Sequence, residues 1–171
     1  MGALLDLFLD ICLLRKGPQD VPASPILLKW TLAAYGLASL LVQVVSVSPL
    51  TALFQAFLDL GLLVGLTYIV LQMVGFPARF TQTLTALAGT GALFGFAILP
   101  VTIWMNQDLG GGTPAGVPAL LFLGWLIWSL AVVAHVLRHA LSTSVAMAVL
   151  YTLGYLVISV VVATWLFPEM S

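Results

Sequence analysis

Five long stretches of hydrophobic residues follow one another along this chain, separated by short polar segments. The hydrocarbon core of a bilayer is about 30 Å thick, and an α-helix crosses it in about 20 residues. Each stretch is long enough to do so. The sequence therefore predicts an all-α integral membrane protein, a five-transmembrane-helix bundle. The predicted spans are residues 25–47, 49–74, 80–104, 118–137 and 144–166.

Local signals support these boundaries. Ser24 and Ser48 each precede a proline, which places a capping hydroxyl just before a residue suited to the first helical position. Gly75 is a suitable residue to end the second span. A single residue separates the first two predicted spans, so they should form a tight antiparallel hairpin. The longest connection is predicted at residues 106–117, which are rich in glycine.

The composition agrees with burial in lipid. Hydrophobic residues make up 62% of the 171 positions and charged residues only 6%, whereas about 25% of a soluble domain is charged. The formal net charge is −1, and the five Lys and Arg residues form no basic patch, so nucleic acid is excluded as a partner. The lipid bilayer is the partner that the composition predicts.

The positive residues give the chain a predicted orientation. They all fall before or at the start of the first span, between the second and third spans, or between the fourth and fifth: Arg15, Lys16, Lys29, Arg79 and Arg138. Short loops that carry Lys and Arg are retained in the cytoplasm. We therefore expect insertion in the cell (inner) membrane, with a cytoplasmic N-terminus and a short external tail at residues 168–171.

Residues 1–24 are predicted to be a cytoplasmic amphipathic helix and a linker. Apolar side chains recur at helical spacing on one face, and two acids occupy the opposite face. The apolar residues are Leu4, Leu5, Phe8, Ile11 and Cys12, and the acids are Asp6 and Asp10. An interfacial helix that lies in the lipid with its acidic face exposed accounts for this pattern. We favour this interpretation, and a protein partner or packing under the bundle is the alternative.

One carboxyl lies deep in a predicted span. Asp59 is ten positions into the second span, roughly 15 Å from its start and near the bilayer midplane. A charge there costs at least about 3 kcal/mol, so the side chain must be protonated, paired or hydrated. The hairpin register places Ser39 opposite Asp59, and Gln43 opposite Gln55. This candidate intramembrane polar network either fixes the helix register or serves as a proton or cation site.

Small residues also recur at a four-residue spacing. Gly61 and Gly65 lie on one face of the second span, and Gly91 and Gly95 lie on one face of the third. This spacing lets helix backbones approach closely. It does not identify the neighbouring helix, which can belong to the same chain or to another.

A cationic cluster lies at the end of the fourth span. His135, Arg138 and His139 share one helix face, where positive charge complements the helix dipole and can reach lipid phosphates. They are candidate lipid-headgroup contacts. Two histidines without a nearby acid do not make a zinc site, so we expect no metal. The common hydrolytic motifs are absent from the sequence, and we expect neither a cofactor nor enzymatic activity.

The segment that leads into the first span resembles the entry of bacterial Yip1-like membrane proteins. From Leu13 to Pro25 it reads Leu-Leu-Arg-Lys-Gly-Pro-Gln-Asp-Val-Pro-Ala-Ser-Pro. Five spans with a cytoplasmic N-terminus also fit that family. The Asp-Leu-Tyr-Gly-Pro motif of the eukaryotic family is absent, so no functional residue is carried over. The resemblance implies a non-enzymatic protein that organises membranes or binds a partner.

Two functions follow from these patterns. The first is a multi-pass protein that acts through helix–helix or membrane-organising interactions, with other membrane proteins or with itself. It is favoured by the small-residue faces and by loops too short to form an extramembrane domain. The alternative is a small oligomeric transporter or channel that uses Asp59.

Overall fold

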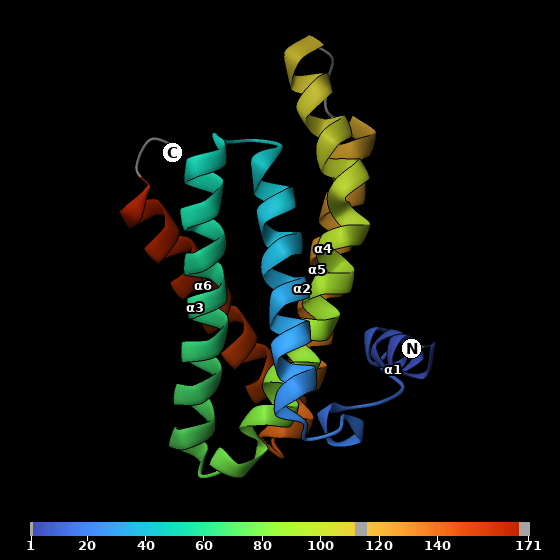
Figure 1. Ribbon diagram of the computed structural model, residues 1–171, viewed down its shortest axis with the longest axis vertical. Coiled ribbons are helices and arrows are strands. Elements are labelled where there is room, and N and C mark those ends of the chain that lie inside the picture. The colour runs from blue at the N-terminus through green and yellow to red at the C-terminus, as the bar shows by residue number, and fades with distance from the viewer. Residues whose placement is uncertain (1, 112–115, 168–171) are drawn as a thin grey trace.

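The structure is a computed structural model. It describes the backbone of residues 2–111 and 116–167, and the side chains of these residues except 108–111. It is all-α (Figure 1). The α-helices are α1 (Gly2–Cys12), α2 (Pro25–Val44), α3 (Pro49–Val74), α4 (Phe80–Gly111), α5 (Gly116–Ala140) and α6 (Val145–Leu166). Short 3-10 helices, η1 (Pro18–Asp20) and η2 (Pro77–Arg79), precede α2 and α4.

The five helices α2 to α6 are long and apolar enough to cross a membrane, which confirms the predicted helical bundle. The chain is a multi-pass membrane protein. Serine hydroxyls start three of these helices: Ser24, Ser48 and Ser144 each accept a hydrogen bond from the backbone N–H three residues later. Gly75 ends α3 in the left-handed region, at φ +83°, where a residue without Cβ is favoured.

Several helix boundaries differ from the sequence-based prediction, and the largest differences are at the end of α2 and around the predicted glycine-rich loop. Helix α2 ends at Val44, three residues before the predicted end, and the chain turns through residues 45–48. Helix α4 continues to Gly111 and α5 begins at Gly116, so most of the loop predicted at 106–117 is helical. Glycine weakens a helix by about 1 kcal/mol relative to alanine but does not stop it as proline does. The remainder of that predicted loop lies outside the described residues.

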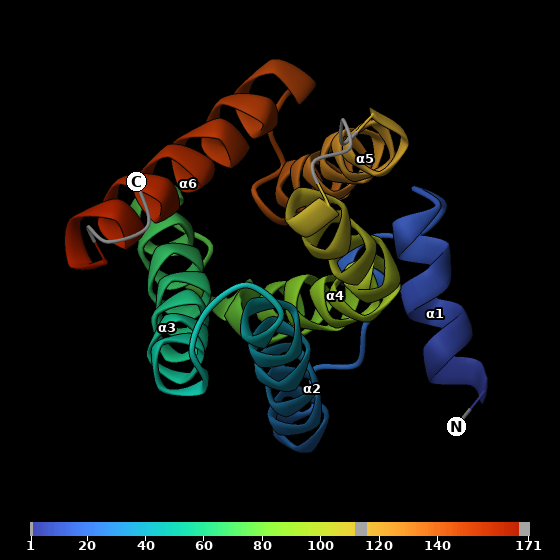
Figure 2. The ribbon, with the colours of Figure 1, turned by 90° about the horizontal axis from the view of Figure 1, so that it is seen from above.

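Helix α4 is the centre of the bundle. It packs on α1, α2, α3 and α5 (Figure 2), and it has the largest buried share of the five long helices. Two glycines permit the close packing of α2 on α4. A Cβ added at Gly91 would lie 2.7 Å from the ring of Tyr35, and one added at Gly95 would lie 2.8 Å from Cβ of Ala38. Gly91 and Gly95 therefore serve contacts within the chain.

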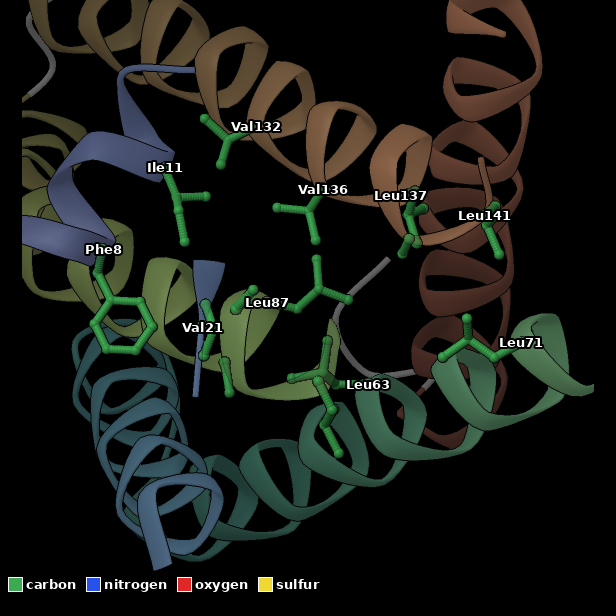
Figure 3. Close-up of a cluster of buried hydrophobic side chains, with 14 of the residues drawn as sticks. Phe8, Ile11, Val21, Leu63, Leu71, Leu87, Val132, Val136, Leu137 and Leu141 are labelled. Atoms are coloured by element: carbon green, nitrogen blue, oxygen red, sulfur yellow. The ribbon is translucent and has the colours of Figure 1, made fainter. Parts of the chain in front are cut away.

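Helix α1 lies across the bundle and packs on α4 and α5 (Figure 2). Its buried residues are Leu7, Phe8 and Ile11, and the Phe8 ring lies against Gly89. Figure 3 shows Phe8 and Ile11 beside apolar side chains of α4 and α5. Leu4 and Leu5 are exposed, so only part of the predicted apolar face contacts protein.

The acidic side of α1 has a partner within the chain. Lys16 Nζ lies 2.8 Å from Asp10 Oδ2, and this ion pair lowers the pKa of the Asp10 carboxyl and raises the pKa of the Lys16 ammonium. Two hydrogen bonds to backbone carbonyls hold the end of the helix. Trp128 Nε1 donates to the carbonyl oxygen of Cys12 at 3.0 Å, and His135 Nε2 lies 3.0 Å from that of Lys16.

Helix α6 is strongly inclined to the bundle axis (Figures 1 and 2). It packs on α5, to which a short turn joins it, and on α3. A cavity lies between α6 and the other four long helices.

Candidate functional site

Asp59 is the centre of a hydrogen-bond network between α2 and α3. Its Oδ2 atom accepts from the hydroxyl of Tyr35 at 2.8 Å and from the hydroxyl of Ser39 at 2.9 Å. Gln43 Nε2 in turn donates to Ser39 Oγ at 3.0 Å. The three residues of α2 are spaced four apart, so they lie on one face of the helix and point toward α3 together.

The network contains three of the four residues that the hairpin register singled out. Ser39, Gln43 and Asp59 lie in it, and Ser39 contacts Asp59 at the depth that the register predicts. Gln55 is buried one turn nearer the start of α3. Whether these residues carry a function stays a prediction.

Tyr35 is the member that sequence reasoning missed. It lies one helical turn, about 6 Å, from the position level with Asp59. A rule based on equal depth therefore does not select it. Its long side chain covers this offset, and its hydroxyl reaches the carboxyl from the next turn of α2. A signal was present in the sequence, because Tyr35 precedes Ser39 by four residues on the same face.

The two oxygens of the Asp59 carboxyl differ in their surroundings. A carboxylate oxygen has about two lone-pair sites. Oδ2 uses both for Tyr35 and Ser39, and Oδ1 makes no hydrogen bond with the rest of the described chain. Any proton on this carboxyl therefore belongs on Oδ1. This oxygen is the one left for a ligand.

Asp59 borders a cavity of about 400 Å³ that lies between all five long helices. Most of the lining is aliphatic or aromatic. Thr90 and Ser129 also line it, but their hydroxyls donate to backbone carbonyls of their own helices. Thr67 and Tyr151 also carry hydroxyls, but the one carboxyl of the described lining, with its two side-chain donors, is at Asp59. Other lining residues are Val42, Leu63, Leu66, Phe94, Ile98, Trp125, Val133, Leu150, Gly154 and Ile158.

Helix α6 contributes a second tyrosine to this polar corner. Tyr155 lines the cavity and lies close enough to Tyr35 and Asp59 to interact with both electrostatically. Two phenol groups, one from α2 and one from α6, thus stand beside the single carboxyl. Among the described lining residues there is no Lys, Arg, His, Cys or Glu.

The three cationic residues predicted near the end of α5 have different surroundings. His135 contacts the Lys16 carbonyl, and His139 Nδ1 lies 2.9 Å from the carbonyl oxygen of His135. Arg138 is exposed. The two imidazole rings are 4.4 Å apart, between centroids. His135 thus helps to hold the segment after α1, and lipid-headgroup contact by the three residues stays a prediction.

The hydrogen bonds to Asp59 can be tested by a double-mutant cycle. Tyr35→Phe and Ser39→Ala should each lower the free energy of unfolding by about 0.6 to 1.7 kcal/mol, the range for hydrogen bonds between membrane helices. Both effects should largely vanish in an Asp59→Ala background, where the acceptor is gone. Unfolding by SDS titration in mixed micelles would measure them.

Tyr151→Phe is the matched control for this cycle. Tyr151 lies on α6 and lines the same cavity, and among the described residues its hydroxyl has no bond to Asp59. Its substitution should cost the same in both backgrounds. An equally large effect of Tyr35→Phe with and without the Asp59 carboxyl would contradict the proposed pairing.

Comparisons with known proteins complete the description of the site. Searches against protein-family models, curated proteins and solved structures find no match to this chain. The resemblance of residues 13–25 to bacterial Yip1-like proteins stays a prediction. The hydrogen bonds, the cavity and the charges of the chain itself are therefore the observations that bear on its function.

Proposed function

We propose that this membrane protein binds a largely apolar ligand with one hydrogen-bonding end, in the cavity between its five long helices. The observation that carries this proposal is the contrast between the apolar lining and the single polar corner at Asp59. Ligand sites in proteins are mostly apolar, with a few polar groups that fix the orientation of the ligand. A cavity of about 400 Å³ accommodates a small lipid-soluble molecule or part of an acyl chain.

Asp59 Oδ1 anchors the polar end of this ligand. A protonated carboxyl would donate through Oδ1, and an ionised one would accept there. A hydroxyl on the ligand suits both forms, because it donates and accepts. Tyr155 supplies a further hydroxyl from α6 on the same side of the cavity. The ligand class is therefore an alcohol or phenol with a hydrophobic body.

This proposal differs from the transporter or channel alternative in the nature of the ligand. A path for ions needs polar groups or water along its length. The lining away from Asp59 is mostly aliphatic and aromatic, which favours an apolar molecule over a hydrated ion. We also propose binding without catalysis, since Asp59 is the only acid, base or nucleophilic thiol among the described lining residues.

We propose that the N-terminus is cytoplasmic and that the protein resides in the cell (inner) membrane. The start of α4 and the end of α5 lie at the same end of the bundle (Figure 1). They are joined by a hydrogen bond of 2.8 Å from Arg79 Nη1 to the carbonyl oxygen of Ala140. Lys29, near the start of α2, belongs to this end as well. Gathering of positive residues at one end favours its retention in the cytoplasm.

A second candidate function is association through α3. Gly91 and Gly95 are used within the chain, whereas a Cβ added at Gly61 or Gly65 would meet nothing within 4 Å. The α3 face is therefore open to the backbone of a neighbouring helix. This observation favours contact with a second copy or another membrane protein. Such contact would agree with the membrane-organising role that the Yip1-like resemblance implies.

A substitution whose side chain fills the cavity should lower the amount of bound ligand. Gly154 lines the cavity, and a Cβ there would meet nothing within 4 Å, so the ring of Gly154→Phe can enter the space. We expect mass spectrometry of protein purified in mild detergent to find an apolar alcohol or phenol. Gly154→Phe should lower its occupancy by about tenfold. Asp59→Ala should also lower it.

Gly124→Phe is the control, because Gly124 is exposed on α5 and lies outside the cavity. Equal occupancy in the two phenylalanine variants would exclude the cavity as the site. Loss in Gly154→Phe without loss in Asp59→Ala would leave the cavity but reject the anchor. Ion flux in proteoliposomes that Asp59→Asn abolishes would favour the transporter alternative.

The orientation can be tested by cysteine labelling. In a Cys12→Ser background, Ser46→Cys in the α2–α3 turn should react with an impermeant maleimide in right-side-out vesicles. Ala23→Cys should react only in inside-out vesicles. Burial raises the pKa of the native Cys12 thiol to about 11, so its thiolate fraction at neutral pH is about a hundredfold below that of an ordinary cysteine. The opposite labelling pattern would reverse the assignment.

The open face of α3 predicts the outcome of a crosslinking experiment. Gly61→Leu and Gly65→Leu should reduce crosslinked complexes in membranes several-fold, because the added side chains prevent close helix approach. Gly124→Leu on α5 should leave them unchanged. If the unsubstituted protein forms no crosslinked complex, or if all three variants behave alike, association through α3 is rejected.

A further inference from the structure

A second, more polar pocket lies at the end of the bundle where α4 begins and α5 ends. Its volume is about 280 Å³. It lies between η1, the first turn of α4 and the turn from α5 to α6. Six of its eight lining residues carry polar side chains: Gln19, Arg79, Gln82, Thr83, His139 and Ser142. This pocket is separate from the Asp59 cavity, with which it shares no lining residue.

Arg79 is held in a fixed orientation at this pocket. Its Nη1 atom donates to the carbonyl oxygen of Ala140 at 2.8 Å and to the hydroxyl of Ser142 at 2.7 Å. The guanidinium carbon lies 4.3 Å from the centroid of the Phe76 ring. Both hydrogen bonds use Nη1, one of the three guanidinium nitrogens. The N–H groups on Nε and Nη2 make no hydrogen bond with the other described residues, and this edge of a guanidinium binds two oxygens of one anion.

No carboxylate among the described residues neutralises Arg79. The ion pair found in this part of the molecule joins Lys16 to Asp10. Asp20 is the nearest acid in the adjoining η1 helix, and its Oδ2 accepts from the backbone N–H of Gly17 at 2.9 Å. The pocket therefore holds a guanidinium in position without an opposing charge. The carbonyl oxygens at the end of α5 offset only part of the positive charge of this guanidinium.

His139 adds a second nitrogen to the pocket. A backbone carbonyl only accepts hydrogen bonds, so Nδ1 of His139 is the donor toward the carbonyl oxygen of His135. Nε2 is then the nitrogen that remains for a ligand, and it donates to an anion in the doubly protonated form of the ring. Arg138, the residue before His139, is exposed and does not line the pocket. Of the three cationic residues at the end of α5, the pocket thus selects His139.

We propose that this pocket binds a phosphate group, with the Nε and Nη2 edge of Arg79 as its main contact and His139 as the second. A phosphate has several anionic oxygens in the geometry that an arginine fork matches. The volume is that of a headgroup rather than of a whole lipid. Helices that span the hydrocarbon core end near the headgroups, so a pocket at the end of these helices suits a bilayer phosphate. A phospholipid headgroup and a soluble phosphate compound share this chemistry.

The experiment uses the full-length protein in dodecyl maltoside. Dioleoyl phosphatidylglycerol, dioleoylglycerol and inorganic phosphate are added separately, and thermal stability and native mass spectra are recorded. The phospholipid should bind and raise the melting temperature, whereas dioleoylglycerol, which has the same chains without phosphate, should not. Arg79→Gln should weaken phospholipid binding by roughly tenfold. Stabilisation by inorganic phosphate alone, with no phospholipid binding, would identify a soluble ligand.

Two further variants separate the pocket from general charge and from folding. Lys29→Gln removes one positive charge at the same end of the bundle but outside the pocket, and it should bind like the unsubstituted protein. His139→Phe leaves Arg79 in place and should weaken phospholipid binding. It therefore tests the pocket if Arg79→Gln does not fold. Equal losses in Lys29→Gln and Arg79→Gln, or equal binding of dioleoylglycerol and phosphatidylglycerol, would overturn the proposal.

Discussion

One side chain, Tyr35, joins three of the five long helices. Its ring lies against Gly91 of α4, and its hydroxyl donates to Asp59 of α3, while its backbone belongs to α2. The ring can reach this place only because Gly91 has no Cβ. The hydroxyl compensates a carboxyl that would otherwise be costly at this depth in the bilayer. Close packing and polar pairing therefore depend on each other, and both occur at the border of the cavity.

The parts of the fold that sequence analysis predicted are those set by local chemistry. The number of long helices follows from hydrophobic length, and the starts of α2 and α3 follow from the serine and proline that precede each of them. The contact of Ser39 with Asp59 follows from the short turn that aligns the two helices. In each case, residues near in sequence, or related by a tight hairpin, contain the information.

The parts that were missed depend on helices distant in sequence. The contact of α2 with α4 is the most extensive in the bundle, yet nothing in either segment identifies the other. The spacing of Gly91 and Gly95 is the same as that of Gly61 and Gly65, but only the first pair meets a helix of this chain. The inclination of α6 and the cavity between the five long helices also depend on tertiary packing. The spacing of residues along a single helix does not predict which helices pack together or at what inclination.

Several contacts between distant segments end on a backbone carbonyl. Trp128 donates to Cys12, Gln82 to Val21, Trp125 to Phe94 and Asn106 to Val45 in this way. Every residue offers the same carbonyl, so the accepting position can change its side chain without losing the bond. Only the donor is constrained by the contact. Paired substitutions across related chains would therefore leave little trace of these contacts, and methods that detect contacts from correlated changes would overlook much of what holds this bundle together.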